Sequence, residues 1–197
     1  MEALQSVTYN NTKDANGASR DKGEEVADYT VNYKLVKTGN VYQASQEIKN
    51  FSVNFYGGSL LSGQSTPETT DDVFFQNRAF SATADDLVLA VRTYKFVDLP
   101  TMAAIAGTGL SLSASEADAL NPNLYKLGLQ SETYNHITGR DKGEEVSDYT
   151  INYKLVKNDI GVYTPSESIK NFSVNFYEDA SDNIARASAA GVDASNC

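Results

Sequence analysis

The stretch Arg20–Lys37 reads RDKGEEVADYTVNYKLVK, and the stretch Arg140–Lys157 reads RDKGEEVSDYTINYKLVK. Sixteen of the 18 aligned positions are identical, and the two differences exchange alanine for serine and valine for isoleucine. An internal match of this length indicates that one structural unit occurs twice in the chain.

A second shared stretch extends the repeat. Ile48–Tyr56 (IKNFSVNFY) recurs unchanged as Ile169–Tyr177, and upstream Tyr9-Asn10 matches Tyr134-Asn135. The extra residues between matches fall in stretches rich in Asn, Gly, Asp and Ser, where loops accept insertions. The match therefore divides the chain into a first β repeat over residues 1–56, a unique middle segment over 57–128, a second β repeat over 129–177, and an acidic, Ala-rich tail over 178–197.

Apolar residues in each repeat recur at every second position. In the first copy they are Val31, Tyr33 and Leu35, followed by Phe51, Val53 and Phe55; in the second they are Ile151, Tyr153 and Leu155, followed by Phe172, Val174 and Phe176. This period predicts half-buried antiparallel strands. We therefore expect a mainly β protein, with α+β as the alternative, built from two homologous antiparallel β units. A two-stranded ribbon is marginal alone, so the copies should pack on each other, on the middle segment or on another chain.

The middle segment carries helix signals. Thr83-Ala84-Asp85-Asp86 resembles a capping box, and Leu87, Val91 and Tyr94 follow at helical spacing, which predicts a helix over about 84–96. The β-forming residues of the same stretch favour a strand as the alternative. Further short helices are expected up to about residue 120, and residues 57–70 are typical of a linker. The tail from Asp179 predicts a weakly anchored Ala-rich helix up to Gly191.

Composition excludes several kinds of partner. The chain has 197 residues, of which 41% are hydrophobic and 21% charged, which is enough to bury a core. Its 16 Lys and Arg against 26 Asp and Glu give a net charge of −10, which argues against nucleic acid and anionic membranes as partners. We also expect neither a signal peptide nor a transmembrane segment, because no basic leader and no run of roughly 18 apolar residues occurs.

Residues for catalysis or metal binding are scarce. His136 is the single histidine and Cys197 the single cysteine, so neither a nucleophile–histidine–acid arrangement nor a zinc site is indicated. Carboxylates are plentiful, which leaves a hydrolase with two catalytic carboxylates as a minor alternative. Glu24-Glu25 and Glu144-Glu145 do not favour it, because adjacent side chains point to different sides. We expect no catalytic residue, no metal and no cofactor.

The candidate binding surface is the charged sequence that occurs in both copies. A solvated turn with balanced charges is the simpler interpretation. The same charged sequence displayed twice would also suit a partner with two pseudo-equivalent sites. The predicted partner-binding residues are Arg20, Lys22, Glu24, Arg140, Lys142 and Glu144.

The favoured function is that of a non-enzymatic structural protein in a large symmetric assembly such as a virion, as a decoration, capsid-associated or tail protein. Its partners would be proteins within a homo- or hetero-oligomer. One alternative is a scaffold or linker subunit of an intracellular multiprotein complex. Another is a carbohydrate-binding module, but the alternating pattern assigns the aromatic residues to the core and the chain has no Trp.

Overall fold

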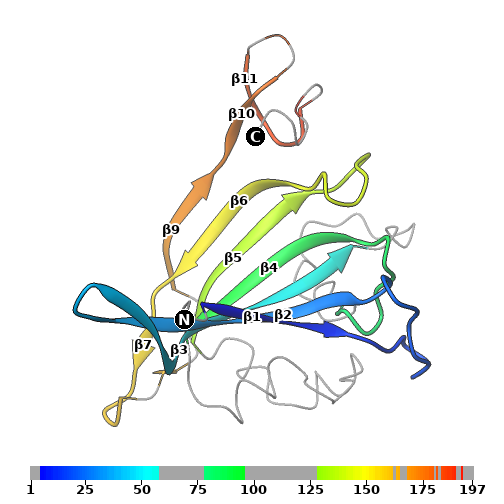
Figure 1. Ribbon diagram of the computed structural model, residues 1–197. Helices are drawn as coiled ribbons and strands as arrows, with labels where there is room; N and C mark the ends of the chain where they lie inside the picture. The colour runs from blue at the N-terminus through cyan, green and yellow to red at the C-terminus, as the bar shows by residue number, and fades with distance from the viewer. Residues whose placement is uncertain are drawn as a thin grey trace.

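The computed structural model describes residues 5–57, 78–95, 128–161, 163–164, 168–179, 181, 183–189 and 192. Its strands are β1 Ser6–Asn11, β2 Val26–Thr38, β3 Val41–Gly57, β4 Leu87–Lys95, β5 Leu129–His136, β6 Val146–Tyr153, β7 Val156–Lys157, β8 Tyr163–Thr164, β9 Ile169–Val174, β10 Phe176–Glu178 and β11 Ile184–Arg186. Seven of them form one antiparallel sheet in the order β1-β2-β3-β4-β5-β6-β9, while β7-β8 and β10-β11 form two small sheets (Figure 1). The prediction of a mainly β, antiparallel protein is confirmed.

The matching stretches pair their strands in the same register. Tyr29 faces Val53 across β2 and β3, and Tyr149 faces Val174 across β6 and β9. The next three pairs agree as well, and both ladders then shift register immediately before Tyr33 or Tyr153. Identical sequences thus give the same ladder twice.

The strands that precede these ladders also correspond. The hydroxyls of Thr8 and Thr30 lie 2.9 Å apart across β1 and β2, and those of Thr133 and Thr150 lie 3.0 Å apart across β5 and β6. Beside each threonine pair two tyrosine rings stack with centroids 4.6 Å apart; the pairs are Tyr9–Tyr29 and Tyr134–Tyr149.

The predicted helix over 84–96 is wrong, because Leu87–Lys95 is strand β4, which lies between β3 and β5. The capping signal does form a hydrogen bond, from the backbone N–H of Thr83 to Asp86 Oδ2 at 2.7 Å. That bond closes a turn, and a strand follows it. Backbone pairing on both edges of β4 and the β-forming Val91, Thr93 and Tyr94 outweigh the helical spacing.

The helix predicted in the tail is also wrong where the tail is described, because Ile184–Arg186 is strand β11 and pairs with β10. Gly57, the first residue of the expected linker, belongs to β3. Residues 58–70 and the short helices expected over 97–120 lie outside the described residues. None of the described residues forms a helix long and apolar enough to cross a membrane.

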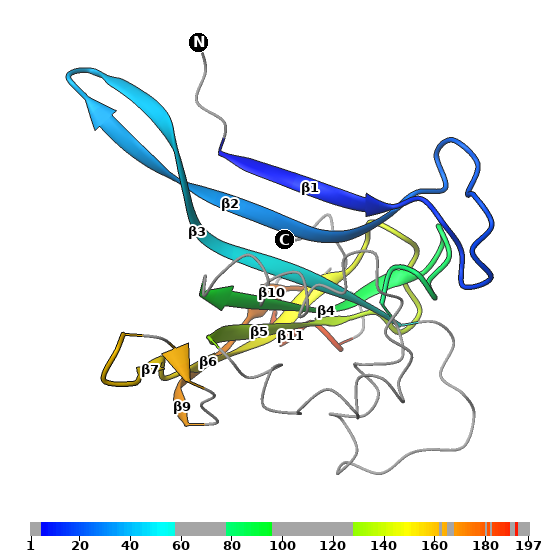
Figure 2. The same ribbon diagram turned by 90° about the horizontal axis from the view of Figure 1, so that it is seen from below.

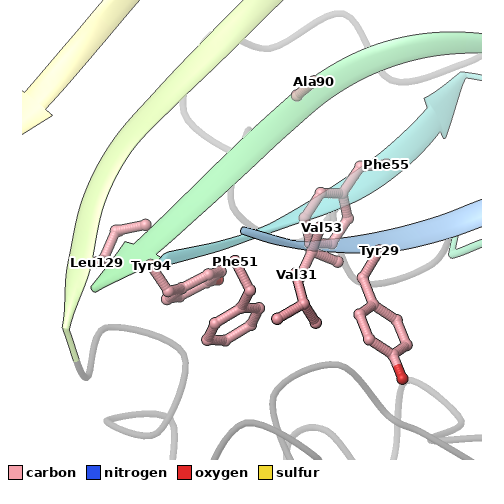
Figure 3. Packing of buried hydrophobic residues seen from close by; sticks show 8 residues of the cluster. All are labelled: Tyr29, Val31, Phe51, Val53, Phe55, Ala90, Tyr94 and Leu129. Carbon is pink, nitrogen blue, oxygen red and sulfur yellow. The ribbon is translucent and has the colours of Figure 1, made fainter. Parts of the chain in front are cut away.

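The main core lies on one face of the large sheet. Phe51, Val53 and Tyr94 are fully buried there, and the rings of Phe51 and Tyr94 stack at 5.1 Å (Figure 3). The opposite face is polar: Ser52 Oγ lies 3.1 Å from Thr93 Oγ1. The buried members of the core cluster are Tyr29, Val31, Phe51, Val53, Phe55, Ala90, Tyr94 and Leu129.

The hairpin of β2 and β3 extends past the other strands of the sheet (Figure 2). Val36, Val41 and Tyr42 near its tip are each more than half exposed. This arm therefore adds little to the core.

Candidate functional site

Two loops of the same sequence, Arg20–Glu25 and Arg140–Glu145, leave the same end of the sheet just before β2 and β6 (Figure 1). We call them the charged loops. Each contains a turn in which the backbone N–H of the first glutamate donates to the aspartate carbonyl at 3.0 Å. Gly23 and Gly143 have φ angles of 96° and 87°, in the region that glycine adopts most readily. The shared sequence therefore specifies the same turn twice.

Carboxylates stabilise both turns. Glu25 Oε2 accepts a hydrogen bond from the backbone N–H of Gly23 at 2.8 Å, and Glu145 Oε2 accepts one from that of Gly143 at 2.9 Å. The side chain of Glu24 accepts a longer bond from the backbone N–H of Asp21. These contacts assign the glutamates a structural role in the turn.

The predicted arginines of the charged loops hold other parts of the chain. Arg20 Nη2 donates to the carbonyl oxygens of Ala79 and Ala82 at 3.0 and 2.6 Å. Arg140 Nη2 donates to the carbonyl oxygens of Ala187 and Val192 at 2.9 and 2.8 Å. Each guanidinium group is thus directed at backbone carbonyls of its own chain.

The other predicted residues remain on the surface. Lys22, Glu24 and Glu144 are exposed. Lys142 is exposed too, and its Nζ donates to the carbonyl of Ala84. The segment from Arg78 to Val88 therefore contacts both loops, since Arg20 binds its start and Lys142 its middle.

Two arginine–aspartate ion pairs were not predicted from the sequence. Arg78 Nη2 lies 2.5 Å from Asp28 Oδ1, and Arg186 Nη2 lies 2.5 Å from Asp148 Oδ2. Burial raises the pKa of Asp28, and the nearby Arg78 offsets part of that rise. The sequence does contain a signal for these pairs. The dipeptide Arg-Ala occurs at 78–79 and at 186–187, after Ile48–Tyr56 and after Ile169–Tyr177, but at different distances from them.

A buried polar cluster joins the middle strand to the second repeat. Arg92 Nε on β4 lies 2.5 Å from Glu132 Oε1 on β5, and the Tyr153 hydroxyl on β6 donates to Glu132 Oε2. Both charged side chains are at most 7% exposed. Burial raises the pKa of Tyr153, and the hydrogen bond to Glu132 adds to the rise, so this hydroxyl stays protonated. Two acceptor oxygens are thereby matched by two donors, as a buried carboxylate requires.

The sequence contains a signal for this cluster as well. Leu4–Asn10 (LQSVTYN) and Leu129–Asn135 (LQSETYN) differ only at Val7 and Glu132. An acidic residue in place of a valine in a matching strand indicates a polar contact that the second repeat makes and the first does not.

A shallow cavity of about 370 Å³ opens beside β5, β6 and β9. Its lining includes Lys95, Gln130, Asn152, Tyr153, Lys170 and Asn171. The described lining holds no carboxylate, so the cavity offers no support for hydrolysis by two carboxylates.

Among the described residues, no three His, Cys, Asp or Glu side chains gather closely enough to hold a metal ion. Comparison of the chain with protein families, with curated proteins and with solved structures finds no match.

Proposed function

We propose that this chain is a non-enzymatic structural protein of a large symmetric assembly such as a virion, and that its repeats are two homologous β units that arose by internal duplication. The observation that carries the proposal is the pair of charged loops, which share sequence, turn and position at one end of a single sheet. A surface that displays the same charges twice is suited to a symmetric partner with two equivalent sites.

In this proposal the residues of the charged loops have two different roles. Arg20 and Arg140 hold the loops by binding backbone carbonyls, so they position the surface. The exposed Lys22, Glu24 and Glu144, together with Lys142, would meet the partner protein. Exposed charges of this kind set orientation and association rate more than affinity.

The native mass of the assembly tests the proposal. Light scattering on the material isolated from the source, with identification of the co-purifying proteins, is expected to give a large particle of fixed stoichiometry. The double variant Lys22→Glu with Lys142→Glu should reduce incorporation of the chain. The matched control, Lys37→Glu with Lys157→Glu, changes the same charge at another repeated pair and should incorporate normally. A monomer in its native source, or equal incorporation of both variants, would contradict the proposal.

A second candidate function, glycan binding, is favoured by the shallow cavity, because amide and ammonium groups are suitable partners for sugar hydroxyls. Asn152 lines this cavity, and Asn32 is its counterpart in the first repeat. In a glycan-array measurement, Asn152→Ala should abolish binding and Asn32→Ala should preserve it. Absence of binding to any glycan would remove this candidate.

A further inference from the structure

The six residues of β9, Ile169–Val174, match Ile48–Val53 of β3, but the two strands have different neighbours. Ile48–Tyr56 in β3 is flanked by β2 and β4. The matching strand β9 pairs with β6 and is the last strand in the sheet order. Figure 1 shows β9 at the outer edge of the sheet, and no strand of the described residues pairs with its other side.

The free edge exposes large apolar side chains. Phe51 in β3 is 1% exposed, whereas its counterpart Phe172 in β9 is 55% exposed. Ile169, at the start of β9, is 55% exposed as well. Exposed edges of this kind are usually short, charged or covered, because their free backbone groups attract another strand.

Strand β4 shows which side chains pack beside the residues that β3 and β9 share. Tyr94 stacks on Phe51, and Thr93 places its hydroxyl 3.1 Å from that of Ser52. Because β9 presents phenylalanine and serine in the same order, a covering strand would need an aromatic residue opposite Phe172 and a hydroxyl opposite Ser173.

We infer that β9 is an acceptor edge for an antiparallel strand that a partner protein supplies, with the side-chain pattern of β4. Strand β4 itself cannot serve, because it is already paired on both edges, with β3 and with β5, and no other strand of the described residues lies beside β9. Strand addition of this kind takes affinity from backbone hydrogen bonds and specificity from alternate side chains. The inference rests on the proposed assembly function and names the chemistry of one contact within it.

The probe is a fluorescent peptide with the sequence of Leu87–Lys95 (LVLAVRTYK), titrated into the intact chain. We expect saturable binding by anisotropy, and slower amide hydrogen exchange at Ile169–Val174 when the peptide is bound. A peptide with Tyr94→Ser should bind roughly tenfold more weakly, because it loses an aromatic pair.

The protein variant Phe172→Lys places a charge on the exposed edge and should weaken binding by roughly tenfold or more. Its matched control is Tyr42→Lys, which replaces another aromatic residue that is more than half exposed, on the hairpin arm. The control should bind as the unchanged protein does, and circular dichroism of both variants should show an intact fold.

Three results would overturn the inference: no binding, equal binding by the two variants, or binding that leaves β9 amides unprotected. Native mass is measured separately from peptide binding. If the native particle is large but the chain does not bind the peptide, only the acceptor edge is refuted. If the chain is a monomer and binds the peptide, only the assembly function is refuted.

Discussion

Strand β9 repeats six residues of β3, yet β3 forms the centre of the core and β9 lies at the rim of the sheet. The difference arises from the strand alongside. β4 covers β3, and its Tyr94 stacks on Phe51, whereas the ring of Phe172 contacts that of Tyr149 on β6 and remains 55% exposed. The comparison teaches that an alternating pattern selects which side chains can be buried, while the neighbouring strand decides whether they are.

The largest expected effect tests this contrast directly. Phe51→Ala should lower the free energy of unfolding by about 4 kcal/mol, because it leaves a cavity in a packed core. Phe172→Ala should change it by less than about 0.5 kcal/mol, because the side chain is already exposed. Urea denaturation followed by circular dichroism measures both, and equal losses would show that the two strands have the same surroundings.

The next effect concerns the place where the matching strands β1 and β5 differ. Glu132→Val installs the residue that the first repeat has at Val7. It leaves Arg92 buried without its carboxylate, so stability should fall by about 3 kcal/mol.

The double variant Arg92→Leu with Glu132→Val serves as the control for the buried pair. It removes both charges and should recover much of the lost stability, measured by the same urea denaturation. If the single variant were as stable as the unchanged protein, the ion pair would have no part in the core.

A smaller contrast is expected between the two arginine–aspartate pairs. Asp28→Asn removes a carboxylate from a pair whose side chains are 12% and 13% exposed, and should cost about 2 kcal/mol. Asp148→Asn should cost less than about 1 kcal/mol, because Arg186 is 43% exposed and solvent screens the pair. Thermal unfolding of the two variants ranks them, and the reverse order would contradict the burial of the first pair.

The smallest effect is a pH dependence in the first repeat. Burial raises the pKa of Tyr29 to about 12 from an ordinary value of 10.0, and the charges of Tyr9 and Asp28 add to the rise. The unfolded chain therefore loses this proton first, so the contribution is intact below about pH 10 and declines between pH 10 and 12.

Tyr29→Phe should flatten part of that decline in urea denaturation at alkaline pH. Tyr42→Phe changes an exposed tyrosine on the hairpin arm, outside this stacked pair, and should leave the slope nearly unchanged. Equal slopes for the two variants would argue against this source of the pH dependence.

Much of the sheet follows from sequence, because alternation over Val31–Leu35 and Phe51–Phe55 is a local property that directly reflects strand geometry. The segment around Leu87 was predicted wrongly as a helix, because its apolar spacing and its capping turn are local signals. Its pairing with β3 and β5 depends on residues far away in the chain. In the tail, Ile184–Arg186 forms a strand for the same reason, because β10 is its partner.

The candidate site was predictable to a similar extent. Repetition identified the charged loops, and Gly23 explains their shared turn. The repeat did not indicate what Arg20 would bind. Its guanidinium donates to a carbonyl of a segment some 60 positions away in the chain. Glu132 is visible as a difference between two matching strands, but its partner Arg92 comes from the middle segment, which has no copy to compare.

The position of β4 has a consequence for how the protein denatures. It hydrogen-bonds to β3 of the first repeat and to β5 of the second, and its Arg92 binds Glu132 of the second. Melting of either repeat would strip one edge of this strand, so the loss should spread to the other. We therefore expect a single cooperative transition for the two halves, with calorimetric and van't Hoff enthalpies that agree.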